Sequence, residues 1–207
     1  MGVVKGMFSG IIEKTGKISR IEKNSDGARL VVSVDSFMDG VKLGDSIALN
    51  GTCITVVSFD SSSFESDLSN ETLKKTTLAN LEVGDDCNLE KAMLLNERIG
   101  GHLVSGHIDG LGKVESIEKD GESFWFKIKA DKQIMKYVVY KGSIAVDGIS
   151  LTVAECDNSS FSVAIIPHTL ECTTLNNKKV DSKVNLEVDM IGKYVEKLVS
   201  PYIDLKE

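Results

Sequence analysis

The sequence predicts an all-β protein made of two tandem, duplicated six-stranded Greek-key β-barrels and a C-terminal α-helix. Its second half repeats its first: residues 8–23, FSGIIEKTGKISRIEK, return 96 positions later as VSGHIDGLGKVESIEK, and residues 46–56 return 97 positions later as SIAVDGISLTV. A period of about 97 residues exceeds the roughly 20–50 residues of a solenoid unit, so each copy is a complete domain. The expected boundaries are 7–100 for the first barrel, 101–189 for the second and 190–207 for the helix.

Short β-strands fill most of each copy. Six segments of the first copy alternate apolar and polar residues or form short apolar runs, with Gly, Asp, Asn and Ser between them. Six strands in about 90 residues suit a small Greek-key barrel, and closing the sheet removes its exposed edges. The predicted strands are 16–21, 29–34, 46–49, 53–59, 63–67 and 86–90.

Brief helices are expected between the strands. Asp131 precedes an apolar pattern of one to two turns that reaches Val138, and residues 36–40 form its shorter counterpart in the first copy. Pro167 suits the first turn of a helix, where its missing N–H costs nothing.

The tail has no counterpart between the domains. Its apolar residues follow the i, i+3, i+4, i+7, i+8 pattern of an amphipathic helix and end at a proline. Two interpretations remain open: the helix covers its own domain, or it docks on other copies of the chain. The residues are Ile191, Tyr194, Val195, Leu198 and Val199, followed by Pro201.

The composition is that of an ordinary soluble protein, with 42% hydrophobic and 27% charged residues. The N-terminus lacks the apolar run of a signal peptide and no segment has the roughly 18 apolar residues of a membrane helix, so we expect a cytoplasmic protein. The four cysteines form no CxxC pair and are expected to be reduced. A net charge of -7 disfavours nucleic acid as a partner.

Four motifs carry a family resemblance along nearly the whole chain: MFSGIIEKTGK, NGTCITV, IGGHLVSGHIDG and YKGSIAVDGISLTV. Together they resemble riboflavin synthase of the alpha-chain type, which is built from two lumazine-binding domains. The resemblance implies the dismutation of two molecules of 6,7-dimethyl-8-ribityllumazine into riboflavin and 5-amino-6-ribitylamino-uracil. It also implies a homotrimer held by the C-terminal helix, an association with lumazine synthase, and a reaction without cofactor or metal.

The duplication suits that reaction, because transfer of a four-carbon unit between two copies of one molecule needs both held face to face. In the family, each barrel holds one molecule, and the first barrel of one subunit meets the second barrel of the next. The substrate's ring can delocalise the negative charge that remains when its 7-methyl group loses a proton. The protein therefore mainly has to orient, desolvate and hydrogen-bond the two molecules.

Differences between the copies indicate catalytic roles. His107 stands where the first copy has Ile11, and a histidine is a suitable acceptor for the methyl proton; the alternative is a buried histidine satisfied by a backbone carbonyl. His102 either supports the site from behind or only stabilises the Gly-rich junction, and we favour the structural interpretation. A metal site at these two histidines is disfavoured, because their spacing of five fits neither one strand face nor a helical i, i+4 pair.

Cys53 is replaced by Ser150 in the second copy, and a thiol or hydroxyl there could add to ring position 7 of the acceptor molecule or deliver water to it. The alternative is that Cys53 is a buried thiol with a packing role only. Ser46 and Ser143 are equivalent, and the resemblance favours Ser46 as functional. The catalytic candidates are His107, Cys53, Ser46, Ser150 and Thr152.

The resemblance also implies one substrate pocket in each barrel. Lys141 and Asp147 could equally be solvated loop charges. The first pocket comprises Gly10, Ile11, Ile12, Cys53, Ile54, Thr55, Asp67, Leu68, Ser69, Asn70, Glu71 and Thr72. The second comprises Gly106, His107, Ile108, Lys141, Asp147, Ser150, Leu151, Thr152, Ile166, Pro167, His168, Thr169, Leu170 and Glu171.

Two departures from the family pattern stand out. Residues 1–6, MGVVKG, extend the usual start, and His168 replaces an acid that the first copy keeps as Glu71. A noncatalytic lumazine- or flavin-binding protein is the main alternative function, although the intact SGHIDG and GISLTV motifs favour the enzyme. A nucleic-acid or protein-interaction barrel is disfavoured, because Lys and Arg are outnumbered 24 to 31 and only 6% of residues are aromatic.

Overall fold

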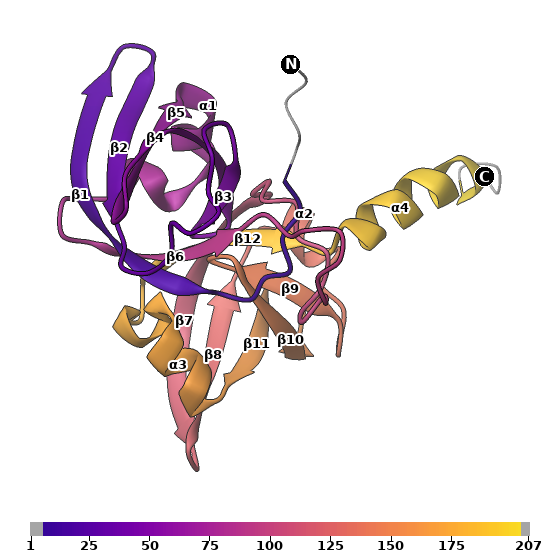
Figure 1. The fold of residues 1–207 in the computed structure, drawn as a ribbon. Coiled ribbons are helices and arrows are strands. Elements are labelled where there is room, and N and C mark those ends of the chain that lie inside the picture. The colour runs from indigo at the N-terminus through magenta and orange to yellow at the C-terminus, as the bar shows by residue number, and fades with distance from the viewer. Residues whose placement is uncertain (1–5, 204–207) are drawn as a thin grey trace.

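The computed structural model describes residues 6–203 and contains two closed antiparallel barrels of six strands each (Figure 1). Both barrels have the same strand order, β1-β2-β5-β4-β3-β6 in the first and β7-β8-β11-β10-β9-β12 in the second, which confirms the predicted fold class. The first barrel consists of β1 (Lys14–Asn24), β2 (Gly27–Ser33), β3 (Ser46–Leu49), β4 (Thr52–Phe59), β5 (Ser63–Ser69) and β6 (Asp86–Lys91). The second consists of β7 (Gly110–Asp120), β8 (Ser123–Lys129), β9 (Ser143–Val146), β10 (Ile149–Cys156), β11 (Ser160–Ile165) and β12 (Lys183–Val188).

Alternation along the strands places one set of side chains in each barrel core. In β2, Leu30 and Val32 are buried between more exposed neighbours, and both belong to the core cluster that also contains Phe64 and Leu89. The second barrel has its own cluster, which includes Phe126 and Phe161. Two separate cores mean that the chain consists of two domains of the same construction.

Short helices connect some of the strands. α3 (Pro167–Cys172) begins at its proline as predicted, and α1 (Asn70–Lys75) is its unpredicted counterpart. α2 (Lys132–Met135) is shorter than the predicted segment. The helix predicted over 36–40 is wrong: this segment forms turns, and Ser36 has a positive φ of 54° that a right-handed helix does not allow. Two 3-10 helices, Thr77–Asn80 and Thr174–Asn177, follow α1 and α3.

The two barrels meet across a local pseudo-twofold axis. Phe8 and Val104, equivalent in the repeat, exchange two backbone hydrogen bonds of 2.8 and 3.0 Å. Two buried asparagines extend this symmetry: Asn88 Nδ2 donates to the Asp147 carbonyl at 2.9 Å, and Asn185 Nδ2 donates to the Asn50 carbonyl at 2.8 Å. Because these contacts come in pairs related by the axis, equivalent surfaces of the two domains face each other there.

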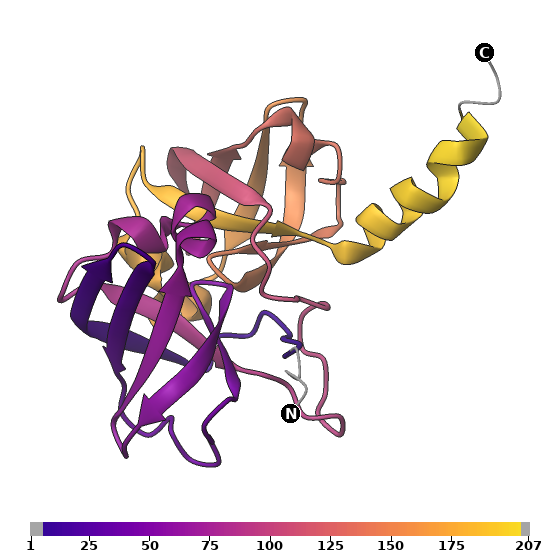
Figure 2. The same cartoon turned by 90° about the horizontal axis from the view of Figure 1, so that it is seen from above.

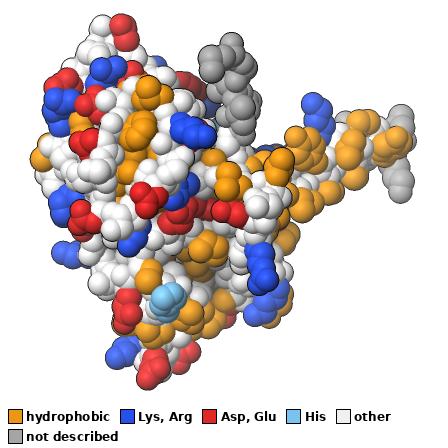
Figure 3. Space-filling view, viewed as in Figure 1, with side chains coloured by type: hydrophobic (Ala, Val, Ile, Leu, Met, Phe, Trp, Pro, Cys, Tyr) orange, Lys and Arg blue, Asp and Glu red, His pale blue; other side chains and the backbone are white. Residues whose placement is uncertain are grey.

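α4 (Met190–Ile203) extends away from both barrels (Figure 2). Its apolar stripe faces outward: Tyr194 is 65% exposed and Leu198 is 68% exposed, and hydrophobic side chains run along the projecting helix in Figure 3. The interpretation that the helix covers its own domain is therefore wrong. Ion pairs hold its start to the second barrel, with Lys136 to Glu196 at 2.8 Å and Lys193 to Asp109 at 2.6 Å.

The helix continues through Pro201, where the sequence predicted its end, because a proline in the last turn removes few backbone bonds. Among residues 6–203, no helix is both long and apolar enough to cross a membrane. Of the N-terminal extension noted above, residues 1–5 lie outside the described part of the chain.

Candidate functional site

Each barrel has a split between two neighbouring strands. β4 pairs with β5 only from Val56↔Ser66 to Phe59↔Phe64. The residues before Val56 in β4 and after Ser66 in β5 are not paired with each other, and we call this opening the split. Cys53–Thr55 pair with β3, and Asp67–Ser69 pair with β2. Two of the three predicted segments of the first pocket, 53–55 and the beginning of 67–72, therefore lie on the two sides of one split.

The second barrel is split at the equivalent place. β10 pairs with β11 from Val153↔Val163 onward, whereas Ser150–Thr152 pair with β9. The opposite side of this split leads from the end of β11 through Ile166 into α3, which carries the rest of the predicted segment 166–171. Strand edges of this kind offer backbone N–H and C=O groups to a flat heterocyclic ligand.

The loops that precede β1 and β7 cross to the opposite barrel. The Cys53 N–H donates to the Gly106 carbonyl at 2.8 Å, and the Ser150 N–H donates to the Gly10 carbonyl at 2.7 Å. Both glycines have φ near +77°, and a Cβ on Gly106 would lie 2.5 Å from the Cys53 Cβ, so only glycine fits. The close contact between each loop and the opposite barrel therefore depends on backbone atoms and on the two glycines.

Because the loops cross, some predicted residues lie at the other barrel from the one to which the sequence assigned them. His107 follows Gly106 and is exposed beside the Cys53 end of the first-barrel split, whereas the prediction grouped it with Ser150. Ile12 packs against the core of the second barrel rather than the first. The loop that carries His107 therefore lies against the backbone of Cys53.

Ser150 has a second partner, His102, which the sequence indicated as structural. The His102 Nδ1 lies 2.7 Å from the Ser150 Oγ, and the side chain is only 9% exposed. Within residues 6–203 its Nε2 is buried and has no hydrogen-bond partner. Burial lowers the pKa of His102, so the imidazole is neutral near pH 7 and holds the serine hydroxyl as an uncharged partner.

The lowered pKa of His102 predicts a pH-dependent stability. Unfolded histidine takes up a proton as the pH falls through 6.5, but the folded state does not, so stability is lost below that pH. We expect the unfolding free energy of His102→Gln, measured by urea denaturation, to fall less between pH 7 and pH 5 than that of the unchanged protein. Burial raises the pKa values of Glu90 and Glu187, so the stability that they contribute is lost as the pH rises above 4.5, in the opposite direction, but both groups are present in both proteins. Parallel curves for both proteins would contradict the prediction.

The Cys53 thiol is half-buried at the split. Burial raises its pKa, a hydrogen bond with Ser46 lowers it, and the charge of Glu187 raises it. The raised pKa favours a protonated thiol at neutral pH, suited to holding water or donating a hydrogen bond. Cys87 is inert by comparison, since burial raises its pKa to about 12, and Cys156 and Cys172 are exposed and free.

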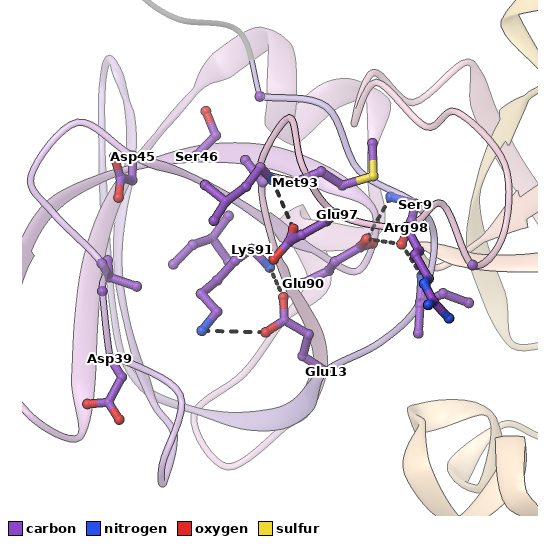
Figure 4. A pocket seen from close by; sticks show the side chains of 18 of the residues that line it. Ser9, Glu13, Asp39, Asp45, Ser46, Glu90, Lys91, Met93, Glu97 and Arg98 are labelled. Carbon is purple, nitrogen blue, oxygen red and sulfur yellow. Dashed lines mark hydrogen bonds and ion pairs between the residues drawn. The ribbon is translucent and has the colours of Figure 1, made fainter.

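A cavity of about 720 Å³ lies on the first barrel, between β3, β6 and the segment that links the barrels (Figure 4). Ile11 and Ser46 line it, as does Lys91, whose backbone N–H donates to Glu13 at 2.7 Å. Arg98 lines its far side. Of the residues predicted for the first barrel, the structure therefore brings Ile11 and Ser46 to this cavity and Cys53 to the adjoining split.

Asp147 and Lys141 lie apart from each other. Asp147 is completely buried between the barrels, where it accepts the Asn185 N–H at 2.7 Å and forms an ion pair with Lys178 at 2.7 Å. Lys141 occupies an exposed turn and lies over the Tyr140 ring at 5.0 Å. The position of Asp147 favours a role in domain docking.

Polar residues elsewhere in the predicted pockets already have protein partners. Asp67 pairs with Arg29 at 2.7 Å, and this contact lowers the pKa of Asp67. Ser69 Oγ caps α1 by accepting the Thr72 N–H at 3.1 Å. His168 is exposed on α3, with a ring nitrogen 3.8 Å from the Cys172 sulfur.

Comparison with known proteins agrees with this geometry. The model of the lumazine binding domain matches the chain twice, at residues 9–92 and 105–189. The riboflavin synthase of Actinobacillus pleuropneumoniae is 49% identical over 193 residues, which is 93% of this chain and 90% of the relative. The chain belongs to the riboflavin synthase family. The riboflavin synthase of Schizosaccharomyces pombe is 41% identical and is matched over 96% of its length, with 95% of this chain covered.

Solved structures of LumP share the fold of this riboflavin synthase family member. The complex of LumP with riboflavin has a TM-score of 0.82 at 25% identity, covering 87% of this chain and 98% of that chain. The complex of LumP with 6,7-dimethyl-8-(1'-D-ribityl) lumazine has a TM-score of 0.79 with the same coverage. The double barrel of LumP therefore binds ligands of both kinds.

Sequence reasoning missed two buried residues beside the site, Glu90 and Glu187. Both accept hydrogen bonds from the crossing loops. A signal was present, since Asn-Leu-Glu ends at Glu90 in the first copy and at Glu187 in the second, at the same shift of 97 as the other motifs. Buried acids that recur in both copies indicate shared loop anchoring.

Proposed function

We propose that the chain is a riboflavin synthase, converting two 6,7-dimethyl-8-ribityllumazine molecules into riboflavin and 5-amino-6-ribitylamino-uracil by transfer of a four-carbon unit. One observation carries the proposal: a chain of this family presents the same split at the same strands of both barrels. Two equivalent sites suit a reaction in which donor and acceptor are the same compound. Holding both molecules in register supplies much of the rate enhancement.

The two sites together have groups suited to both parts of the reaction. His107 takes the proton from the 7-methyl group of the donor, whose ring delocalises the resulting charge. Cys53 and Ser150 place a thiol and a hydroxyl at equivalent positions, where they hold water or add to ring position 7 of the acceptor. Thr55 and Thr152 are exposed at the two splits and hydrogen-bond the ligand.

A noncatalytic lumazine- or flavin-binding protein is the second candidate, because the LumP complexes have the same fold. The intact second-copy motifs favour the enzyme. His107 and Ser150 both lie in those motifs, and Ser150 is held by two hydrogen bonds. A protein that only stores ligand does not need this second set of groups.

Blocking either split tests the requirement for two sites. Thr55→Arg and Thr152→Arg place the same bulky charge at equivalent exposed positions, so each should fold and still bind lumazine at the unchanged barrel. We expect each variant to lose riboflavin formation by more than about 100-fold, because one bound molecule has no partner. Isothermal titration gives the binding and absorbance gives the turnover. Normal turnover in either variant would contradict the two-site proposal.

The proposal includes a homotrimer, supported by the outward-facing stripe of α4. In a cyclic trimer, the first barrel of one subunit would face the second barrel of the next. Co-expression of the two blocked variants should then restore about one quarter of the turnover of the unchanged protein, because an intact pair arises at one interface in four. No recovery would place both substrates within one chain. An association with lumazine synthase and a cytoplasmic location stay predictions from the sequence.

A further inference from the structure

Two buried glutamates hold the loops that cross between the barrels. Glu90 and Glu187 are 3% and 2% exposed and occupy equivalent positions on β6 and β12. Glu187 Oε1 accepts the Ser105 N–H and Oγ–H at 2.7 Å each, and Oε2 accepts the Gly106 N–H at 2.9 Å. Each carboxylate thus gathers three donors from a two-residue segment.

Glu90 repeats this arrangement in the first copy. Its Oε1 accepts the Ser9 N–H at 2.7 Å and the Ser9 Oγ–H at 2.8 Å, and its Oε2 accepts the Gly10 N–H at 3.0 Å. Three donors and no acceptor suit an ionised carboxylate, which has only acceptor sites. Burial raises the pKa of both groups, and the hydrogen bonds from the loops oppose that shift.

The loops transmit this anchoring to the other barrel. Gly106, held by Glu187 of the second barrel, accepts the Cys53 N–H of the first barrel at 2.8 Å. Gly10, held by Glu90 of the first barrel, accepts the Ser150 N–H of the second barrel at 2.7 Å. Only one residue, a glycine, separates each carboxylate from the N–H group of the other barrel that it supports.

We propose that Glu187 and Glu90 are positioning residues acting in a crossed manner: Glu187 sets Cys53 and His107 at the first-barrel site, and Glu90 sets Ser150 at the second-barrel site. The inference rests on the proposed function only in giving these residues roles in the reaction. Each barrel then organises the reactive end of the other. This couples the two sites within one chain, besides any coupling between subunits.

Glu187→Gln tests the proposal with little change in shape. The amide oxygen can keep both bonds to Ser105, but the amide nitrogen turns its hydrogens toward the Gly106 N–H, so the anchor is lost there. We expect iodoacetamide to alkylate Cys53 several-fold faster, because a negative charge that raises the thiol pKa is removed and the covering loop is loosened. We also expect kcat for riboflavin formation to fall roughly 10- to 100-fold.

Glu90→Gln is the matched control. It should lower kcat through Ser150 while leaving the alkylation rate of Cys53 unchanged. Both variants are made in a background of Cys156→Ser and Cys172→Ser, so that the exposed thiols do not contribute. Alkylation is read by mass spectrometry without substrate, so its result is independent of whether the protein turns over lumazine.

Equal alkylation rates in Glu187→Gln and the unchanged protein, or equal acceleration by both glutamine variants, would overturn the proposal. If Glu187→Gln does not fold, Ser105→Ala removes one of the three donors and should accelerate the alkylation of Cys53 in the same direction by a smaller factor. An unchanged rate in a folded Ser105→Ala protein would then count against the crossed anchoring.

Discussion

Replacing His107 with alanine is expected to lower riboflavin formation by roughly 10²- to 10⁴-fold while changing lumazine affinity little. The side chain follows Gly106, whose carbonyl is fixed against the Cys53 N–H, so its backbone is held at the first-barrel site. The imidazole is exposed, as the proposed role in accepting the methyl proton requires. Steady-state kinetics and a fluorescence titration with lumazine give the two quantities.

Comparison with Ile11→Ala separates chemistry from packing, because Ile11 occupies the equivalent position on the other crossing loop. That variant should lose affinity more than turnover, since isoleucine has no group that can accept a proton. Equal losses of turnover and affinity in His107→Ala would assign the histidine to binding or folding.

Placing charges in the apolar stripe of α4 should abolish the proposed trimer and, with it, turnover. Val195→Glu with Leu198→Glu puts two carboxylates on a face that is exposed in one chain and that we expect to be buried between chains. We expect analytical ultracentrifugation to show a 22.5 kDa monomer, with riboflavin formation reduced by at least about 100-fold because the productive barrels separate.

Lys197→Glu introduces a carboxylate on the same helix outside the stripe and serves as the control. It should leave the trimer and turnover intact. A monomeric Val195→Glu, Leu198→Glu protein with full activity would show that one chain holds both substrates.

Much of the fold could be predicted because the alternation that marks a strand lies within a few residues and because the same pattern occurs in both copies. Alternation located β2, β3 and β4 within about two residues, and the repeat transferred those strands to the second copy. The failure at 36–40 was also local: an Asp-Ser pair before apolar residues resembles a helix start, but Ser36 adopts a left-handed conformation.

The site could be predicted only in part, because the decisive contacts join residues that are distant in the chain. The repeat groups residues by barrel, so it assigned His107 to the second pocket, whereas the fold brings its loop to Cys53. His102 lacked a periodic pattern, and its contact with Ser150 depends on how the linking segment packs. The direction in which α4 points likewise depends on its ion pairs with the second barrel.

The most direct test of the account is to incubate the purified protein with 6,7-dimethyl-8-ribityllumazine alone and to quantify substrate loss and riboflavin gain together. The account predicts that two lumazine molecules disappear for each riboflavin formed, with 5-amino-6-ribitylamino-uracil as the second product. Tight binding of lumazine with an unchanged absorption spectrum and no riboflavin would contradict it, and would identify the double barrel as a ligand-binding protein.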